Sequence, residues 1–349
     1  MRLAFDLIFR LALWLLIAPL IPGIINKVKA WVAGRRGPPV LQLYYDLGRL
    51  WQKGVVLSTV VSPGHVTGPA IAWVALAGAA MLLPVGSLWS TVVFRGDAFL
   101  FIYLLALARF CTVSAALDTG SAFEGMGAAR EVSYAVIAEA ALIAGLLALA
   151  RQSGSLALAE MLAPSAGAGA ALLGAGLFTV LLAENSRVPF DDPNTHLELT
   201  MVHEAMVLDH SGPPLAAILH GAALKLLIFS VLLAEAVLPI GKLPPLAAFA
   251  ALGAAVLAIA VAVGLVESLM ARAAFKRVPL LLTTGFLLCL FALLAAWKSA
   301  EATRDEVRRD QAVSGALGER ALPTLPRPGD FRVVTRPSGG GGRVEGGCS

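Results

Sequence analysis

Long runs of apolar residues recur along this chain, separated by polar stretches of very different length. A helix needs about 20 mostly apolar residues to cross the hydrocarbon core of a bilayer. The runs that reach this length predict about eight membrane-spanning helices, at 4–25, 68–86, 98–117, 132–150, 165–183, 215–238, 246–268 and 279–298. Because none of them alternates strictly between apolar and polar residues, we expect an all-α integral membrane bundle.

The composition agrees with this reading of the hydropathy pattern. Of the 349 residues, 58% are hydrophobic and only 14% are charged, and the mean hydropathy is +0.79. A soluble domain carries roughly 25% charged residues, so a soluble protein is excluded, and nothing in the pattern indicates nucleic-acid binding. The first run is too long for a signal-peptide core and lacks a small-residue cleavage site, so we expect it to be retained.

The pattern divides the chain into a membrane domain, 1–298, and a polar tail, 299–349. Within the membrane domain, two large loops at 26–67 and 184–214 stand out. The tail is rich in Pro, Gly and Arg and has few large apolar residues. It cannot offset the entropy of folding, and we expect it to be disordered.

The basic residues predict the orientation of the bundle. They concentrate in alternate loops, at 26–67, 118–131, 184–214 and 269–278. The positive-inside rule therefore places these loops in the cytoplasm, and an even number of spans places both termini outside.

Cysteine is scarce, at positions 111, 289 and 348, and no CxxC pair occurs. The chain therefore offers neither a disulfide framework nor the thiolate ligands of an iron–sulfur or nickel–iron centre. We expect it to hold no metal and no cofactor.

A few ionisable residues fall within the predicted spans. Such a group in hydrocarbon costs at least about 2.5 kcal/mol, so it usually faces the bundle interior or a hydrated path. Glu139 and Lys225 lie well inside their spans, which favours a proton path or an ion pair. For Arg109, a functional role and a simple ion pair with a carboxylate are equally good readings. Glu235 and Glu267 lie near span ends, where an interfacial side chain is an equally good reading.

The strongest concentration of charge is "AENSRVPFDDPNTHLELTMVHEAMVLDHSG", from Ala183 to Gly212. Close carboxylates raise one another's pKa, which lets a row of them hold and pass protons near neutral pH. Large apolar residues stand among the charges, and this mixture indicates a surface that another protein covers.

Prolines 189 and 193 exclude a continuous helix in the first part of this segment. Thr195 and Glu198 then form a capping-box pattern, which predicts an amphipathic helix from about Thr195 to Asp209. His196, His203 and His210 recur every seven residues on one face of this helix. Such residues are about 10.5 Å apart, too far to share one ion. "HEAMV" also lacks the second histidine of a zinc HExxH motif. We therefore expect the histidines to face a partner protein or the membrane surface.

"AENSRVPFDDPNTHLEL" resembles the signature of the respiratory complex I subunit 1 family, approximately AExxRxPFDxPExxxEL. The following "TMVHEAMVLDHSG" departs from the quinone-reducing members, whose shorter segment ends in YHxEYSG. It is more similar to the membrane subunit of formate hydrogenlyase and hydrogenase-4 type complexes. "GPPVLQLYYDLGRLWQK" at 37–53 and "GAAREVSYAVIAEA" at 127–140 agree, and the resemblance covers roughly 1–298.

The resemblance implies a non-catalytic, eight-helix subunit of a group 4 nickel–iron hydrogenase complex in the bacterial inner membrane. It implies docking of a cytoplasmic hydrogenase arm and a proton path below that arm. The implied partners are hydrogenase large and small subunits, iron–sulfur subunits and antiporter-like membrane subunits, which would hold the nickel–iron centre and iron–sulfur clusters. A quinone-site subunit of an NADH dehydrogenase-type complex is the main alternative. An independent transporter is a third, and the absence of an internal repeat argues against it.

Two sets of residues follow from these arguments. The proton path is assigned to Glu139, Glu184, Asp191, Glu198 and Lys225. Partner docking is assigned to Arg187, Asp192, His196, His203, Glu204, Asp209 and His210.

Overall fold

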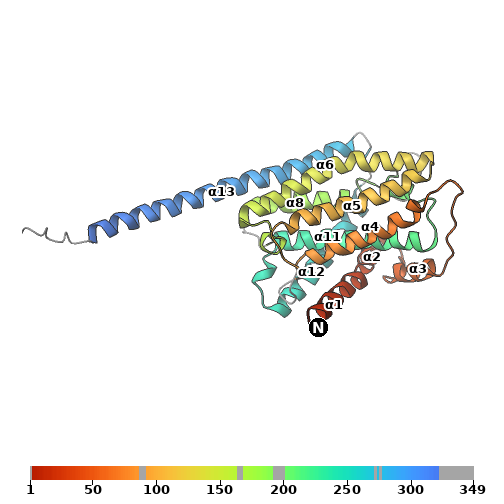
Figure 1. The fold of residues 1–349 in the computed structure, drawn as a ribbon, viewed down its shortest axis with the longest axis horizontal. Coiled ribbons are helices and arrows are strands. Elements are labelled where there is room, and N and C mark those ends of the chain that lie inside the picture. Colours follow the sequence, from red (N-terminus) through yellow and green to blue (C-terminus); the bar gives the residue numbers. More distant parts are fainter. Residues whose placement is uncertain are drawn as a thin grey trace, which may run out of the picture. The chain divides into compact units, whose positions relative to one another are not determined.

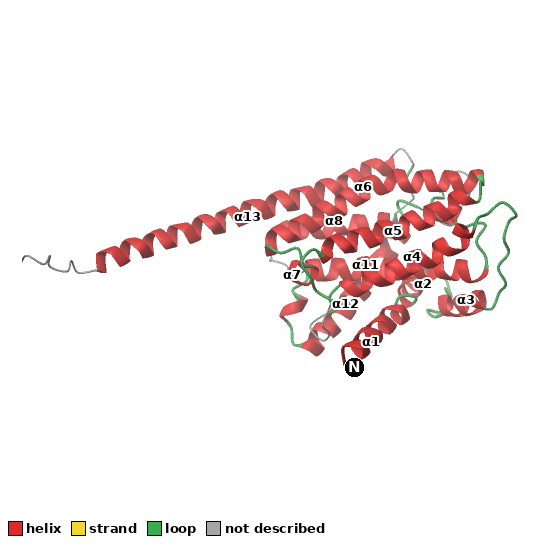
Figure 2. Ribbon diagram, viewed as in Figure 1, coloured by secondary structure: helices red, strands yellow, loops and turns green. Residues whose placement is uncertain are grey.

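The computed structural model describes residues 2–85, 92–162, 168–191, 201–270, 273–274 and 277–321. The regular elements in these ranges are helices, and no extended strand occurs among them (Figures 1 and 2). In chain order they are α1 Arg2–Ile17, α2 Leu20–Val32, α3 Gln42–Trp51, α4 Pro63–Leu82, α5 Asp97–Asp118, α6 Ala122–Ser153, α7 Leu158–Met161, α8 Ala168–Glu184, α10 His203–Met206, α11 Gly212–Val237, the 3₁₀ turn η1 Ile240–Lys242, α12 Pro245–Leu269 and α13 Val278–Ala321.

Seven helical stretches in the described ranges are long and apolar enough to cross a membrane. They are α1 and α2 taken together, then α4, α5, α6, α11 and α12, and the first part of α13. Helix α8 coincides with the remaining predicted span; it is apolar but has 17 residues, a rise of about 25 Å. The prediction of an all-α membrane bundle is confirmed, although α8 is short for a full crossing.

The first predicted span, 4–25, is two helices rather than one. Helix α1 ends at Ile17 and α2 begins at Leu20, with Pro19 between them. Proline lacks a backbone N–H and its ring clashes with the preceding turn, so it interrupts the helical hydrogen bonds here.

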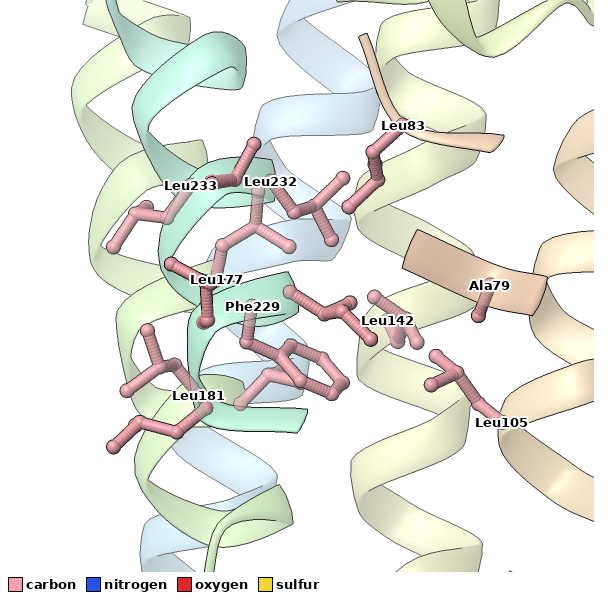
Figure 3. Close-up of a cluster of buried hydrophobic side chains, with 14 of the residues drawn as sticks. Ala79, Leu83, Leu105, Leu142, Leu177, Leu181, Phe229, Leu232 and Leu233 are labelled. Atoms are coloured by element: carbon pink, nitrogen blue, oxygen red, sulfur yellow. The ribbon is translucent and has the colours of Figure 1, made fainter. Parts of the chain in front are cut away.

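Large aliphatic and aromatic side chains from most of the helices form the core, and Figure 3 shows the part of it that includes residues of α5, α6, α8 and α11 and Leu83 just after α4. Leu142 on α6, Leu177 on α8 and Phe229 on α11 meet in its centre. Helix α8 also passes very close to α13. A Cβ atom on Gly176 would lie 3.1 Å from the backbone nitrogen of Cys289, so only glycine fits there. The small residues on this side of α8 therefore allow close helix packing.

Hydrogen bonds join the four loops that carry most of the basic residues. The bonds run from Val56 N to Ser211 Oγ (2.9 Å), from Ser62 N to Asp118 Oδ2 (2.7 Å), from the Arg130 guanidinium to Met201 O (3.1 Å) and from Ala273 N to Pro189 O (3.1 Å). The loops 26–67, 118–131, 184–214 and 269–278 thus meet at one end of the bundle, which we call the loop end. This agrees with their assignment to one side of the membrane.

The carboxyl-terminal part differs from the expected disordered tail. The compact membrane unit ends at Ala300, close to the predicted boundary, but α13 continues to Ala321. The segment beyond Ala300 is rich in Ala, Glu and Arg, which favour helix over coil. Residues 299–321 are therefore helical, and 322–349 lie outside the described residues.

Candidate functional site

The guanidinium of Arg109 on α5 reaches three carboxylates with three different nitrogen atoms. Its Nε lies 3.5 Å from Glu131 Oε1, Nη1 pairs with Glu139, and Nη2 pairs with Glu184. Glu131 and Glu139 come from α6, and Glu184 is the last residue of α8. The ion pair expected for Arg109 is present, and it connects three helices.

A second cation completes this group. Lys225 on α11 places its Nζ 2.8 Å from Glu184 Oε2, so Glu184 bridges the two cations. The Glu184 side chain is only 2% exposed, whereas that of Glu139 is 38% exposed. The Arg109 cluster (Arg109, Glu131, Glu139, Glu184 and Lys225) therefore has a buried centre and one accessible edge. Lys225 thus finds its partner on another helix.

A pocket connects the Arg109 cluster to the charged segment. It is lined by Arg109, Glu131 and Glu184 of the cluster and also by Phe190, Asp191 and neighbouring residues of the segment. Two of the five residues assigned to a proton path, Glu184 and Asp191, thus line one pocket, and Glu139 and Lys225 border it through their ion pairs. The fifth, Glu198, lies outside the described residues.

Asp191 is buried and holds the loop in place. Its Oδ2 accepts hydrogen bonds from the backbone N–H groups of Val202 and His203, both at 3.1 Å. The carboxylate thereby fixes the backbone that follows the undescribed residues 192–200. Its position beside the pocket agrees with the proposed path, and its bonds to the backbone give it a structural role as well.

Arg187 belongs to a second ion-pair group. Its Nη1 lies 3.3 Å from Glu267 Oε1 on α12, and Lys29 on α2 lies 2.8 Å from the other oxygen of Glu267. The Glu267 side chain is 2% exposed. The interfacial reading of Glu267 is therefore wrong, because this end of α12 is covered by α2 and by the turn after α8. Arg187 ties the charged segment to the bundle.

The histidine stripe does not form as predicted. Helix α10 covers only His203–Met206, and the chain turns away through residues 207–211 to begin α11. His210 leaves the helix and packs against His65, with their ring centroids 4.0 Å apart. His210 is 5% exposed, so its assignment to partner docking is wrong. His203 and Glu204 are half-buried and Asp209 is exposed, which leaves them accessible to a partner. Asp192 and His196 lie outside the described residues.

Sequence reasoning missed Glu131. The predicted span began at position 132, but α6 is a single helix of 32 residues that begins at Ala122. Glu131 precedes Glu139 by eight residues, roughly two turns, which places both on the same side of α6. The spacing of the two glutamates, read over a longer helix, would have identified it.

Within the described ranges, no group of three His, Cys, Asp or Glu side chains is arranged to hold a metal ion. Cys111 and Cys289 are free thiols buried on separate helices.

Comparison with known proteins agrees with the bundle and the loop motifs. A family model described as NADH dehydrogenase matches residues 5–298. Hydrogenase-4 component C of Escherichia coli K12 is 31% identical over 292 residues, which cover 80% of this chain and 91% of that protein. Formate hydrogenlyase subunit 4 of the same organism is 30% identical over 297 residues, covering 80% and 95%.

The solved structures show the same fold. A chain of the membrane-bound sulfane sulfur reductase, an archaeal respiratory membrane complex, superimposes with a TM-score of 0.74 at 20% identity. The match covers 85% of this chain and all of that one. This chain is therefore a multi-pass membrane protein that belongs to the NADH dehydrogenase family, in its complex I subunit 1-like form.

Proposed function

We propose that this chain is the membrane-anchoring and proton-path subunit of a group 4 nickel–iron hydrogenase complex of the formate hydrogenlyase or hydrogenase-4 type. It docks the cytoplasmic hydrogenase arm on its 184–214 loop and couples redox chemistry in that arm to proton movement through the bundle. The observation that carries the proposal is the Arg109 cluster, which lies at membrane depth and shares a pocket with the docking loop.

The geometry of the Arg109 cluster suits proton transfer. Because three carboxylates share one guanidinium, a proton bound by Glu139 cancels one charge and leaves Arg109 held by Glu131 and Glu184. The ion pairs can thus rearrange as a proton passes, without leaving a buried charge unpaired. Glu131, Glu139 and Glu184 are all held around one guanidinium, so water in the adjoining pocket could pass a proton from one carboxylate to another.

The redox centres belong to the partners in this proposal. The nickel–iron centre and the iron–sulfur clusters lie in the hydrogenase large and small subunits and the iron–sulfur subunits, since this chain has no CxxC pair. Antiporter-like membrane subunits contact the bundle, and the complex resides in the bacterial cytoplasmic (inner) membrane. The likeness to hydrogenase-4 component C and formate hydrogenlyase subunit 4 supports this assignment.

The main test removes one charge from the path. Glu139→Gln, in the intact complex in sealed membrane vesicles, is expected to keep the full set of subunits and to lower redox-driven proton translocation at least about tenfold, because an amide cannot take part in acid–base transfer. Glu160→Gln on α7 is the matched control and is expected to change neither. Full translocation in Glu139→Gln would show that the proton-path role is wrong.

The identity of the partner proteins distinguishes the hydrogenase subunit from the quinone-site alternative. That alternative is considered because the matched family model is described as NADH dehydrogenase. We expect a tagged chain to co-purify with a soluble protein that has two CxxC pairs and contains nickel and iron. Co-purification with an NADH-oxidising, quinone-reducing arm instead would establish the alternative.

A further inference from the structure

A second group of titratable side chains lies at the loop end, apart from the Arg109 cluster. His65 at the start of α4 stacks on His210, with ring centroids 4.0 Å apart and ring planes tilted by 32°. Glu124, in the first turn of α6, accepts a 3.0 Å hydrogen bond from the backbone N–H of Asp209. His65, His210 and Glu124 are 2%, 5% and 0% exposed, so this His–Glu cluster is enclosed by the protein.

Several polar atoms of the His–Glu cluster lack a partner. His65 Nδ1 lies 3.1 Å from the carbonyl oxygen of Ala115, which only accepts, so Nδ1 carries a hydrogen. Among the described residues, both ring nitrogens of His210 and the Oε2 atom of Glu124 lack a hydrogen-bond partner at ordinary distance and angle. Buried polar atoms are normally satisfied. Three such atoms in one enclosed place therefore indicate a further occupant that both donates and accepts hydrogen bonds, as a water molecule does.

Helix α6 connects the His–Glu cluster to the Arg109 cluster. Glu124 and Glu131 are seven residues apart, so they lie on the same face about 10.5 Å apart along the axis. Glu131 in turn lies 3.5 Å from Arg109 Nε. One face of α6 thus carries carboxylates from the loop end into the pocket.

A small apolar cluster lies between the His–Glu cluster and the Arg109 cluster. Val113 and Ala116 on α5, Ala128 on α6 and Met206 on α10 form a small buried apolar cluster of their own. Along α5 the first two follow Arg109, and along α6 Ala128 lies between Glu124 and Glu131. A proton cannot cross this interval without water, so the long, flexible side chain of Met206 decides whether the two clusters are connected.

We propose that Glu124, together with His65 and His210, is the proton-accepting entrance of the path at the loop end, and that Met206 on α10 closes its connection to Glu131. This inference rests on the proposed function and names the entrance of the same path.

The proposed steps are proton transfers only, so they need no oxidant or reductant. An O–H bond of a hydronium ion breaks and leaves a water molecule, and an N–H bond forms at a free ring nitrogen of His210, beside the exposed Asp209. That bond breaks as an O–H bond forms at Glu124 Oε2. When Met206 moves aside and admits water, the O–H bond breaks and the proton reaches Glu131.

The charged and titratable groups around Glu124 come from each neighbouring element. They are His65 on α4 and Asp209 in the loop, whose backbone N–H donates to Glu124. None of the ion pairs found in the described part of the chain involves Glu124. Glu124 is therefore free of a cation that would hold it permanently as a carboxylate.

The test uses Glu124→Gln in the intact complex in sealed vesicles. Glutamine keeps the oxygen that accepts the Asp209 N–H but cannot take part in acid–base transfer. Redox-driven proton translocation is expected to fall at least about tenfold with unchanged subunit content. In infrared spectra taken across a pH titration, the variant is expected to lose one carboxylic acid C=O band. Glu160→Gln, at α7, is the control and is expected to keep both signals.

Two further variants make the result decisive. Met206→Ala removes the closing side chain and is expected to raise the passive proton leak of the vesicles several-fold, the opposite of Glu124→Gln. If Glu124→Gln does not assemble, His210→Gln serves instead and is expected to shift the pH profile of translocation. Normal translocation in Glu124→Gln, alongside its loss in Glu139→Gln, would overturn the entrance and leave the proposed function standing. Normal translocation in both would overturn both, and an unchanged infrared titration would reduce Glu124 to a structural residue.

Discussion

Burial, more than residue type, decides what each ionisable side chain does in this chain. Glu267 and Glu184 have side chains that are each 2% exposed, and each is held by two cations. Glu139 shares the same arginine as Glu184 but keeps a 38% exposed side chain. The first two are therefore fixed points of the structure, and Glu139 is the carboxylate best placed to exchange protons.

His210 provides a prediction at this scale. Burial, and to a lesser extent the nearby His65 ring, lowers the pKa of His210 to about 4, against about 6.5 for an exposed histidine. When the segment is released, His210 binds a proton more tightly than it does in the folded form. The loop packing is therefore fully stable above about pH 6.5 and is weakened as the pH falls toward 4, by at most about 3 kcal/mol.

Hydrogen exchange of the 201–211 backbone amides, corrected for the intrinsic pH dependence, measures this effect. Faster exchange is expected at pH 5 than at pH 7 in the native chain, and His210→Gln is expected to flatten the difference. Equal corrected protection of the native segment at both pH values would contradict the assignment.

At the scale of elements, ion pairs attach the charged segment to the bundle. The turn after α8 is held to α12 and α2 through Arg187, Glu267 and Lys29, and the end of the same loop is held to α6 by Glu124. The segment that we propose as the docking surface thus contacts α6, which carries Glu139 of the proton path, as well as α2 and α12. Movement of a docked partner would be transmitted directly to these helices.

The Glu267 group predicts strongly non-additive substitutions. Arg187→Ala or Lys29→Ala alone leaves Glu267 one cation, so each is expected to lower the free energy of unfolding by about 1 kcal/mol or less. The double variant leaves a buried carboxylate unpaired and is expected to cost about 3–5 kcal/mol. Thermal denaturation of the detergent-purified chain measures the double-mutant cycle. Adding Glu267→Gln is expected to restore most of the loss, and simple additivity would argue against a shared buried partner.

At the scale of the whole membrane unit, the four basic loops are joined by hydrogen bonds at one end. The docking loop, the His–Glu cluster and the mouth of the pocket are all at that end. Proton entry and partner attachment are therefore expected on the same side of the membrane.

Cysteine labelling tests this arrangement. In a background free of native cysteines, Lys53→Cys and Asp209→Cys are expected to react with an impermeant reagent from the cytoplasmic side. Gly241→Cys, in the turn between α11 and α12, is expected to react only from the other side. Labelling of positions 53 and 209 from opposite sides would contradict the common loop end, and labelling of both only from outside would reverse the orientation.

The sequence by itself determined the all-α membrane class and the long apolar helices. A run of about 20 apolar residues has few alternatives in a bilayer, because only a helix satisfies its own backbone hydrogen bonds there. The long motif from Ala183 likewise identifies the family by its residues alone, and the comparisons agree. These properties are local, so neighbouring residues are sufficient to reveal them.

Only the tertiary structure decided which charges meet. Arg109 is 30 residues from Glu139 and 75 residues from Glu184 in the sequence. Arg187 and Glu267 are 80 residues apart. Helical periodicity gives the face on which a residue lies but not the helix that packs against that face. For the same reason the histidine repeat was misread. Its spacing of seven fits a helix, but the contact with His65 and the start of α11 draw His210 out of the helix and bury it.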